Sequence, residues 1–262
     1  MEFKPKKSLG QNFLIDQNIL DVIIQCSQIK ENQRILEIGP GTGNLTNKLI
    51  LSRPKELILI EKDKQLSKLL IDKFKNNIKL YNRDVLKTDF ENIVKNKMIF
   101  FGNLPYNVSS QILVKFIKNE KLNSICKKMV LMFQKEVAQR ILAQTNEKHY
   151  GRLSIMCSWR LKMRKIKDVK PGSFYPPPKI NSTILLFEPK IEYFSFKNSK
   201  NLEKITSTFF SQKRKMIKTP LKHLFLDYKK IANKFDLDLS LRPQNLTPNT
   251  YFKICREYEK LN

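Results

Sequence analysis

Residues 34–43 read Arg34-Ile35-Leu36-Glu37-Ile38-Gly39-Pro40-Gly41-Thr42-Gly43, an apolar run that ends in a glycine-rich segment. The apolar run predicts a buried strand. The glycines predict a tight turn in which the backbone can adopt positive φ and pass close to a ligand. Beyond the turn, Leu45–Leu51 predicts a helix. A strand, a glycine-rich turn and a helix in this order are typical of the ligand-binding edge of a parallel α/β sheet.

Strand and helix patterns alternate from about residue 18 to 190 and predict a mostly parallel α/β sheet of the Rossmann-like type. The other expected strands are Glu56–Ile60, Lys79–Asn82, Met98–Gly102, Lys128–Phe133, a run near Leu153–Ile166, and Ser182–Phe187. The other expected helices are Gln65–Lys75, Ser110–Lys118 and Lys135–Thr145. No crossover helix is evident between the last two strands, so we expect them to form an antiparallel pair that closes the sheet.

The pattern becomes purely helical after Pro189. Apolar residues recur near helical spacing at Leu202, Ile205, Phe209, Met216 and Ile217, and the cations Lys213, Arg214, Lys215 and Lys218 occupy the polar face. Thr219-Pro220 predicts the start of the next helix, followed by helices over Asp227–Phe235 and Pro248–Leu261. We therefore expect an α/β domain over residues 1–189, with a basic lid at 1–17, and a basic helical domain over 190–262.

The charge balance indicates an anionic partner. The 262 residues include 50 Lys and Arg against 24 Asp and Glu, a formal net charge of +26. A surface with this excess attracts polyanions, so nucleic acid is the leading candidate and an acidic membrane surface is the second. A genome rich in A and T explains part of the lysine content, but it does not explain the scarcity of acids.

The cysteine pattern argues against a metal centre. Cys26, Cys126, Cys157 and Cys255 lie far apart, and the chain has 2 histidines, so neither a zinc site nor a Cys/His nucleophile is predicted. Isolated thiols suit a reducing compartment. The charged N-terminus lacks a following apolar segment, and no apolar run approaches the roughly 20 residues of a membrane span. We expect a cytoplasmic monomer without a membrane or metal partner.

Two acidic residues follow the next predicted strands and suggest what the glycine-rich turn binds. Glu61 ends the second strand, where a carboxylate can accept hydrogen bonds from both hydroxyls of a ribose. Asp84 follows the third strand and can accept from an adenine amino group. The turn that contains Gly39 and Gly41 departs from the G-x-G-x-x-G pattern of dinucleotide-binding folds. Together these features favour S-adenosylmethionine over NAD, although either acid alone could be a solvated strand end.

The segment Asn103-Leu104-Pro105-Tyr106, at the end of the fourth predicted strand, points to methyl transfer to an exocyclic adenine nitrogen. That nitrogen is a poor nucleophile because its lone pair is delocalised into the ring. Acceptors at the Asn103 side chain and at the Leu104 or Pro105 carbonyl would favour a pyramidal nitrogen with a directed lone pair. Tyr106 offers a face for base stacking, worth about 1–3 kcal/mol. In-line placement of nitrogen, methyl and sulfur would then supply most of the rate enhancement.

Two further segments are candidates for the same pocket. Lys7–Leu14 precedes the first helix and could fold over the cofactor as a lid. Phe174-Tyr175-Pro176-Pro177-Pro178-Lys179 is a stiff aromatic and proline edge that could clamp a flipped base opposite Tyr106. Without further information, each segment could equally be a surface loop, and either Phe174 or Tyr175 could provide the stacking ring.

Taken together, these residues resemble the ribosomal RNA adenine N6,N6-dimethyltransferase family, and within it the small-subunit branch. The matching stretches run in order across nearly the whole chain: Lys7–Asp16, Glu37–Gly43, Glu61–Asp63, 84–86, Asn103–Ser109, 134–137, 150–154, 176–179 and 212–215. The resemblance implies a class I methyltransferase fold and two adjacent adenosines near the 3′ end of 16S rRNA as the substrate, each dimethylated within the assembling small subunit.

The resemblance also implies residue roles. Implied cofactor contacts are Asn12, Leu14, Gly39, Glu61, Asp84 and Asn103, and implied contacts with the target adenine are Asn103, Leu104, Tyr106 and Phe174. We expect RNA contacts at Lys6, Lys7, Lys179, Lys213, Arg214 and Lys215. Lys213 stands where many relatives carry Arg, which keeps the charge but loses bidentate geometry.

Three alternatives share parts of this pattern. The related large-subunit enzyme of macrolide resistance typically has Ile in place of Leu104 and matches the Pro-Pro-Pro-Lys stretch less well. DNA adenine methyltransferases usually carry Asp-Pro-Pro-Tyr or Asn-Pro-Pro-Tyr and a separate domain that reads sequence. A ribosome-assembly factor without catalysis is the third, and the intact Asn103 and Tyr106 argue against it.

Overall fold

The computed structural model describes residues 10–261, and the chain divides into two compact units. The first, which we call the sheet unit, comprises Met1–Ala138 and Lys162–Pro189. The second, the helical unit, comprises Gln139–Leu161 and Lys190–Asn262. The helical unit thus includes Gln139–Leu161 in addition to the residues expected for it, because α8 (Arg152–Arg160) packs against α9 (Ser199–Phe210) and α12 (Pro248–Leu261).

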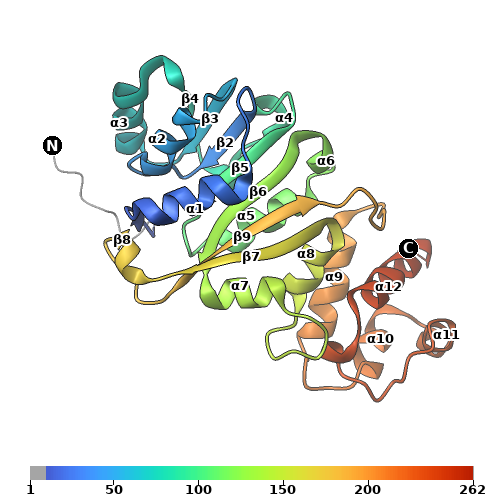
Figure 1. Cartoon of the computed structure of the whole chain (residues 1–262). Coiled ribbons are helices and arrows are strands. Elements are labelled where there is room, and N and C mark those ends of the chain that lie inside the picture. The colour runs from blue at the N-terminus through green and yellow to red at the C-terminus, as the bar shows by residue number, and fades with distance from the viewer. Residues whose placement is uncertain (1–9, 262) are drawn as a thin grey trace. The chain divides into compact units, whose positions relative to one another are not determined.

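A seven-stranded sheet forms the centre of the sheet unit, with the strand order β4-β3-β2-β5-β6-β9-β7 (Figure 1). The strands are β2 (Arg34–Ile38), β3 (Glu56–Glu61), β4 (Lys79–Asn82), β5 (Met98–Asn103), β6 (Cys126–Gln134), β7 (Leu161–Val169) and β9 (Ser182–Pro189). The first five of these pair in parallel, and β9 runs antiparallel to β6. The predicted fold class is therefore confirmed. The strand order changes direction between β2 and β5, and this places a switch point at the carboxyl end of β2, where such sheets bind ligands.

Helices and a small second sheet complete this unit. The helices are α1 (Gln17–Ser27), α2 (Asn44–Leu51), α3 (Lys64–Phe74), α4 (Phe90–Ile93), α5 (Ser109–Lys118) and α6 (Leu122–Ile125), and α7 (Lys135–Leu142) begins here. Asp16 and Asp63 cap α1 and α3 by accepting from backbone N–H groups of the first turn. β1 (Phe13–Leu14) pairs with β8 (Phe174–Tyr175), with Leu14 opposite Phe174. This pairing fixes the N-terminal segment beside a strand about 160 residues further along the chain.

The run near Leu153–Ile166 was expected to be a strand, and this prediction is wrong for its first half. Residues 152–160 form α8, and only Leu161–Val169 forms β7. The start of α8 is fixed by Ser154, whose hydroxyl accepts from the N–H of Gly151 and donates to the carbonyl of Arg140. The apolar face of α8 then recurs at helical spacing at Ile155 and Trp159, which are both buried.

The helical unit packs around α9 and α12, with α10 (Lys218–Leu224) and α11 (Tyr228–Lys234) beside them. The buried carboxylate of Glu259 accepts from the backbone of Lys197 and Asn198 and so ties the start of α9 to α12. α9 ends at Phe210, so the expectation that Lys213–Lys215 lie on a helix is wrong. These residues lie in a turn in which the N–H of Lys215 donates to the carbonyl of Gln212 at 2.8 Å.

Candidate active site

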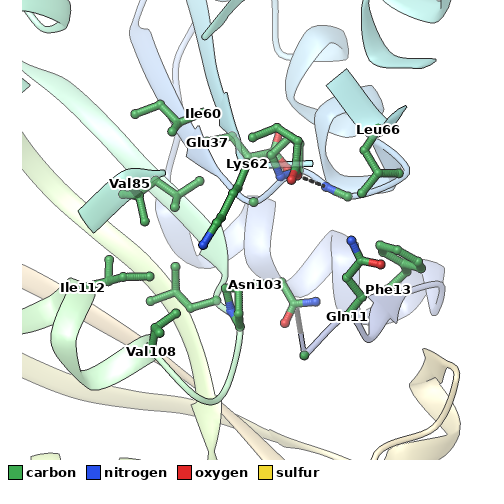
Figure 2. Close-up of a pocket in the computed structure, with 18 of the residues that line it drawn as sticks. Gln11, Phe13, Glu37, Ile60, Lys62, Leu66, Val85, Asn103, Val108 and Ile112 are labelled. Atoms are coloured by element: carbon green, nitrogen blue, oxygen red, sulfur yellow. Dashed lines mark hydrogen bonds between the residues drawn. The ribbon is translucent and has the colours of Figure 1, made fainter. Parts of the chain in front are cut away.

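A pocket opens in the sheet unit at the carboxyl ends of β2, β3 and β5 (Figure 2). Five segments line it: 10–14, the glycine-rich turn after β2, the end of β3, 83–86 and 103–108. Parallel strands present their carboxyl ends at one edge of a sheet, which explains why segments so far apart in sequence meet here. Of the predicted cofactor and catalytic residues, Asn12, Leu14, Gly39, Gly41, Glu61, Asp84, Asn103, Leu104, Pro105 and Tyr106 all line the pocket.

The glycine-rich turn packs closely against the N-terminal segment at Phe13. Gly41 has a φ of +59°, and a Cβ at this position would lie 2.6 Å from Cδ1 of Phe13. A larger residue would therefore be strained and would also displace the Phe13 ring. The turn is further held by a 2.9 Å hydrogen bond from the N–H of Gly39 to the carbonyl of Ile60 on the neighbouring strand.

Glu61 is 6% exposed and forms part of the pocket wall. Its Oε1 accepts from the N–H of Asp63 at 2.8 Å, and its Oε2 accepts from the N–H of Gly41 at 3.3 Å. Burial raises the pKa of this carboxyl, while the two backbone N–H groups oppose the rise. Each carboxylate oxygen has a further lone pair. The side chain is therefore fixed in orientation and can still accept hydrogen bonds from a ligand.

Asp84 is held by Lys62, a cation that was not predicted as a site residue. Its Oδ2 forms a 2.9 Å ion pair with Nζ of Lys62, and its Oδ1 accepts from the N–H of Leu86 at 2.9 Å. The hydrogen bond from Lys62 is the main cause of the lowered pKa of this carboxyl. Lys62 immediately follows Glu61 and lines the pocket, as Figure 2 shows, so its position beside a predicted site residue was the available signal.

Asn103 ends β5, and its side chain meets the N-terminal segment. Nδ2 donates to the backbone carbonyl of Asn12 at 2.8 Å. Since a carbonyl accepts only, this contact assigns the NH₂ group to the side of Asn12 and leaves Oδ1 as the other end of the amide. Leu104 beside it is 1% exposed, which anchors the backbone of the turn in the core.

The turn after Asn103 distinguishes the carbonyls of Leu104 and Pro105, which were predicted as alternative acceptors for the target amine. The carbonyl of Pro105 accepts from the N–H of Val108 at 3.1 Å, within the turn that leads into α5. Because the Pro105 carbonyl already accepts this hydrogen bond, the Leu104 carbonyl is favoured as the second acceptor for the hydrogens of the target amine. The hydroxyl of Tyr106 lies 2.7 Å from Oγ of Ser182 on β9, and burial raises the pKa of the phenol. This hydrogen bond fixes the tip of the Tyr106 ring.

The remaining predicted residues lie elsewhere. Phe174 is 2% exposed, packs in the core with Leu14, and is not among the residues that line the pocket, whereas Tyr175 is 60% exposed. The structure therefore does not bring Phe174 together with the other predicted catalytic residues. The side chains of Lys179, Lys213, Arg214 and Lys215 are exposed, and Lys6 and Lys7 lie outside the described residues.

A third carboxylate of the pocket, Glu37, was not predicted as a site residue although it lies in the strand that leads to the turn. It lines the pocket and is 2% exposed, and Oγ1 of Thr46 donates to its Oε2 at 2.7 Å. Burial raises its pKa to about 8. Within residues 10–261 no group of acidic, Cys and His side chains could hold a metal ion, and no helix is long and apolar enough to cross a membrane.

Fold and site together define a methyltransferase of the Rossmann-like type. Residues 2–260 match the family model for ribosomal RNA adenine dimethylase, and the chain belongs to this family. It is 52% identical over 261 residues to the ribosomal RNA small subunit methyltransferase A of Pelagibacter ubique, covering 100% of this chain and 99% of that protein. The protein of the same name from Malacoplasma penetrans is 37% identical, with 99% and 94% of the two chains covered.

Solved structures agree with this assignment. A dimethyladenosine transferase from Plasmodium falciparum superposes with a TM-score of 0.77 at 31% identity, covering 95% of this chain and 98% of that one. The 23S rRNA methyltransferase ErmE shares the fold, with a TM-score of 0.68 at 22% identity, covering 95% and 100% of the two chains. The family predicted from the sequence is therefore confirmed.

Proposed function

We propose that this protein transfers methyl groups from S-adenosylmethionine to the N6 amines of two adjacent adenosines in a hairpin loop near the 3′ end of 16S rRNA, within the small ribosomal subunit. The observation that carries the proposal is that the glycine-rich turn and the Asn103–Tyr106 corner open into one pocket. The small-subunit substrate is supported by the relatives that are 52% and 37% identical over essentially the whole chain.

The groups that line the pocket support S-adenosylmethionine as the cofactor. The close backbone passage at Gly41 suits the methionine tail, the two oriented oxygens of Glu61 suit the ribose, and the carboxylate of Asp84 suits the adenine amine. When bound, the cofactor supplies a sulfonium methyl group that leaves behind a neutral thioether. Asp84 would then share its Oδ2 between Lys62 and the adenine amine.

The chain's own residues prepare the nucleophile. Oδ1 of Asn103 and the carbonyl of Leu104 accept the two hydrogens of the target amine, which turns the nitrogen lone pair out of conjugation and toward the methyl group. Tyr106 stacks on the extruded base and holds it at the required distance, a contribution of about 1–3 kcal/mol. After methylation the nitrogen is acidic enough to release its proton to water, so positioning provides the main rate enhancement. After the first methylation the nitrogen keeps one hydrogen, so the second methylation requires only one of the two acceptors.

The proposal is tested by methyl transfer from labelled S-adenosylmethionine to undermethylated small subunits, with large subunits and duplex DNA as competing substrates. We expect transfer to small subunits alone. Asn103→Ala should lose about a hundredfold to a thousandfold in rate with only a partial loss of cofactor affinity, because the acceptor for the amine is gone.

Transfer to large subunits instead would favour the macrolide-resistance activity. Binding of small subunits without any transfer would favour an assembly factor. Full turnover by Asn103→Ala would contradict the role assigned to that side chain.

A further inference from the structure

The outer strand β7 of the sheet unit carries an unusual density of cations. Residues 162–170 contain Lys162, Arg164, Lys165, Lys167 and Lys170, and every one of these side chains is exposed. The single acid in this stretch, Asp168, is already engaged. Its Oδ2 lies 2.8 Å from Nζ of Lys165 and 3.8 Å from Nζ of Lys135, and its Oδ1 accepts from Thr183. We call the exposed cations of residues 162–170 the β7 stripe.

Protection of a sheet edge does not account for the β7 stripe. Outer strands often carry a lysine because a charge blocks pairing with another chain. The opposite outer strand of the same sheet, β4, reads Lys79-Leu80-Tyr81-Asn82 and meets this need with one cation in 4 residues, against four in the 9 residues of β7. β7 alone, Leu161–Val169, carries Lys162, Arg164, Lys165 and Lys167. The excess on β7 therefore calls for another explanation.

The β7 stripe leads to the wall of the candidate active site. From Lys170 the chain passes through the turn Pro171–Ser173 into β8, which pairs with β1, and both residues of β1 line the pocket. Electrostatics agree with this proximity. The pKa of Asp16, two residues beyond β1, is lowered mainly by a hydrogen bond from Ser173 and more weakly by the charge of Lys167.

We propose that the β7 stripe binds the phosphate backbone of the RNA whose adenosine occupies the pocket. This rests on the proposed function and extends it, because it adds the outer strand β7 to the RNA contacts expected at Lys179 in the sheet unit and at Lys213–Lys215 in the helical unit. Exposed lysines attract phosphates irrespective of sequence, so the β7 stripe would strengthen and orient binding without selecting the adenosine. Figure 1 shows β7 (yellow) as a long outer strand. Because side chains alternate between the two faces of a strand, Lys162 and Arg164 lie on one face of β7 and Lys165 and Lys167 on the other, so the RNA backbone would follow the outer edge that both pairs flank.

The test is the salt dependence of small-subunit binding. The variant Lys162→Gln, Arg164→Gln, Lys167→Gln removes three cations and leaves Lys165 paired with Asp168. A matched control, Lys55→Gln, Lys68→Gln, Lys95→Gln, removes the same charge from three other exposed positions of the sheet unit. Since each phosphate contact contributes about 0.7–0.9 to the slope of log K against log salt, we expect the β7 variant to lower the slope by about two. Its affinity at about 0.1 M salt should fall about tenfold or more relative to the control.

Cofactor affinity and thermal melting of both variants show whether they are folded. If the β7 variant and the control have the same slope and affinity, the β7 stripe is not an RNA contact, and the inference is wrong. If the unaltered protein itself neither binds nor methylates small subunits, the proposed function fails instead. The two failures are therefore distinguishable.

Discussion

At the scale of single residues, one or two hydrogen bonds orient each of the main functional groups of the candidate site. The amide of Asn103 is assigned by one donor contact to the carbonyl of Asn12, and the carboxylate of Glu61 by two backbone N–H groups. The sequence identified both residues from their place at strand ends. It could not identify the partner of Asn103, because the two residues are 91 positions apart and no local pattern links them.

Glu61 gives the first prediction at this scale. Glu61→Ala should weaken S-adenosylmethionine binding by about 30-fold or more, because it removes the acceptors for the ribose and also leaves the N–H groups of Gly41 and Asp63 without their partner. Calorimetric titration of the cofactor measures this directly. Glu61→Gln keeps the size of the side chain and one acceptor, so its cofactor affinity should lie between those of the unaltered protein and Glu61→Ala. Unchanged affinity in Glu61→Ala would exclude the residue from the ribose site.

Glu37 gives a prediction about stability and pH. Its pKa is raised to about 8 by burial, so the folded protein holds a proton that the unfolded chain releases near the ordinary value of 4.5. The contribution of this group to stability is therefore present below about pH 4.5 and is lost progressively as the pH rises to about 8.

Glu37→Gln keeps the volume and cannot ionise, so its melting temperature relative to the unaltered protein should increase between pH 5 and pH 8. Thermal melting of both proteins at the two values measures this difference. A constant difference would show that Glu37 ionises normally.

At the scale of elements, the β-strands were predicted well and the boundaries of helices less well. Strands such as Arg34–Ile38 and Lys79–Asn82 are uninterrupted apolar or alternating runs bounded by turn residues, so their signal is local. The run Leu153–Ile166 combines a helix and a strand without a breaking residue at the junction, and α8 is stabilised by its packing on α9 and α12. Such tertiary packing overrides local preference and is invisible in one sequence.

The attachment of the N-terminal segment gives a prediction at this scale. Oγ of Ser173 donates to Oδ2 of Asp16 at 2.8 Å, and its carbonyl accepts from the N–H of Ile15 at 2.9 Å. Ser173→Ala removes the side-chain bond, worth about 1 kcal/mol. We expect faster amide exchange in residues 12–15 and a several-fold lower kcat, because the carbonyl that orients Asn103 is held less firmly.

Ser173→Thr should restore both properties. The matched control Ser124→Ala removes an exposed 2.8 Å hydrogen bond from the hydroxyl to the carbonyl of Lys121 and should change neither. A normal kcat in Ser173→Ala despite faster exchange would separate the attachment of this segment from catalysis.

At the scale of the whole molecule, the net charge of +26 is the property that the sequence revealed most directly. This charge indicates a polyanionic partner without reference to any particular site. The distribution of this charge over the surface required the structure, because the turn after α9 and the outer strand β7 expose their cations through their place in the fold.

The basic turn in the helical unit gives the prediction at this scale. Lys213→Glu, Arg214→Glu, Lys215→Glu should weaken small-subunit binding strongly and leave cofactor affinity intact, because these exposed side chains belong to the helical unit and the pocket to the sheet unit. The control Lys200→Glu, Lys229→Glu, Lys253→Glu makes the same charge change at other exposed positions of the helical unit. Filter binding at several salt concentrations measures the difference. Equal losses in both variants would indicate a general effect of net charge.

The central claim is that the Asn103–Tyr106 corner holds an extruded adenosine for two successive methylations. The most direct measurement is mass spectrometry of the 16S rRNA 3′ hairpin loop after small subunits that lack the modification react with the protein and S-adenosylmethionine. We predict two adjacent N6,N6-dimethyladenosines in that loop with the unaltered protein, and none with Asn103→Ala. An unmodified loop after reaction with folded, cofactor-binding protein, or methyl groups on other nucleotides, would contradict the claim.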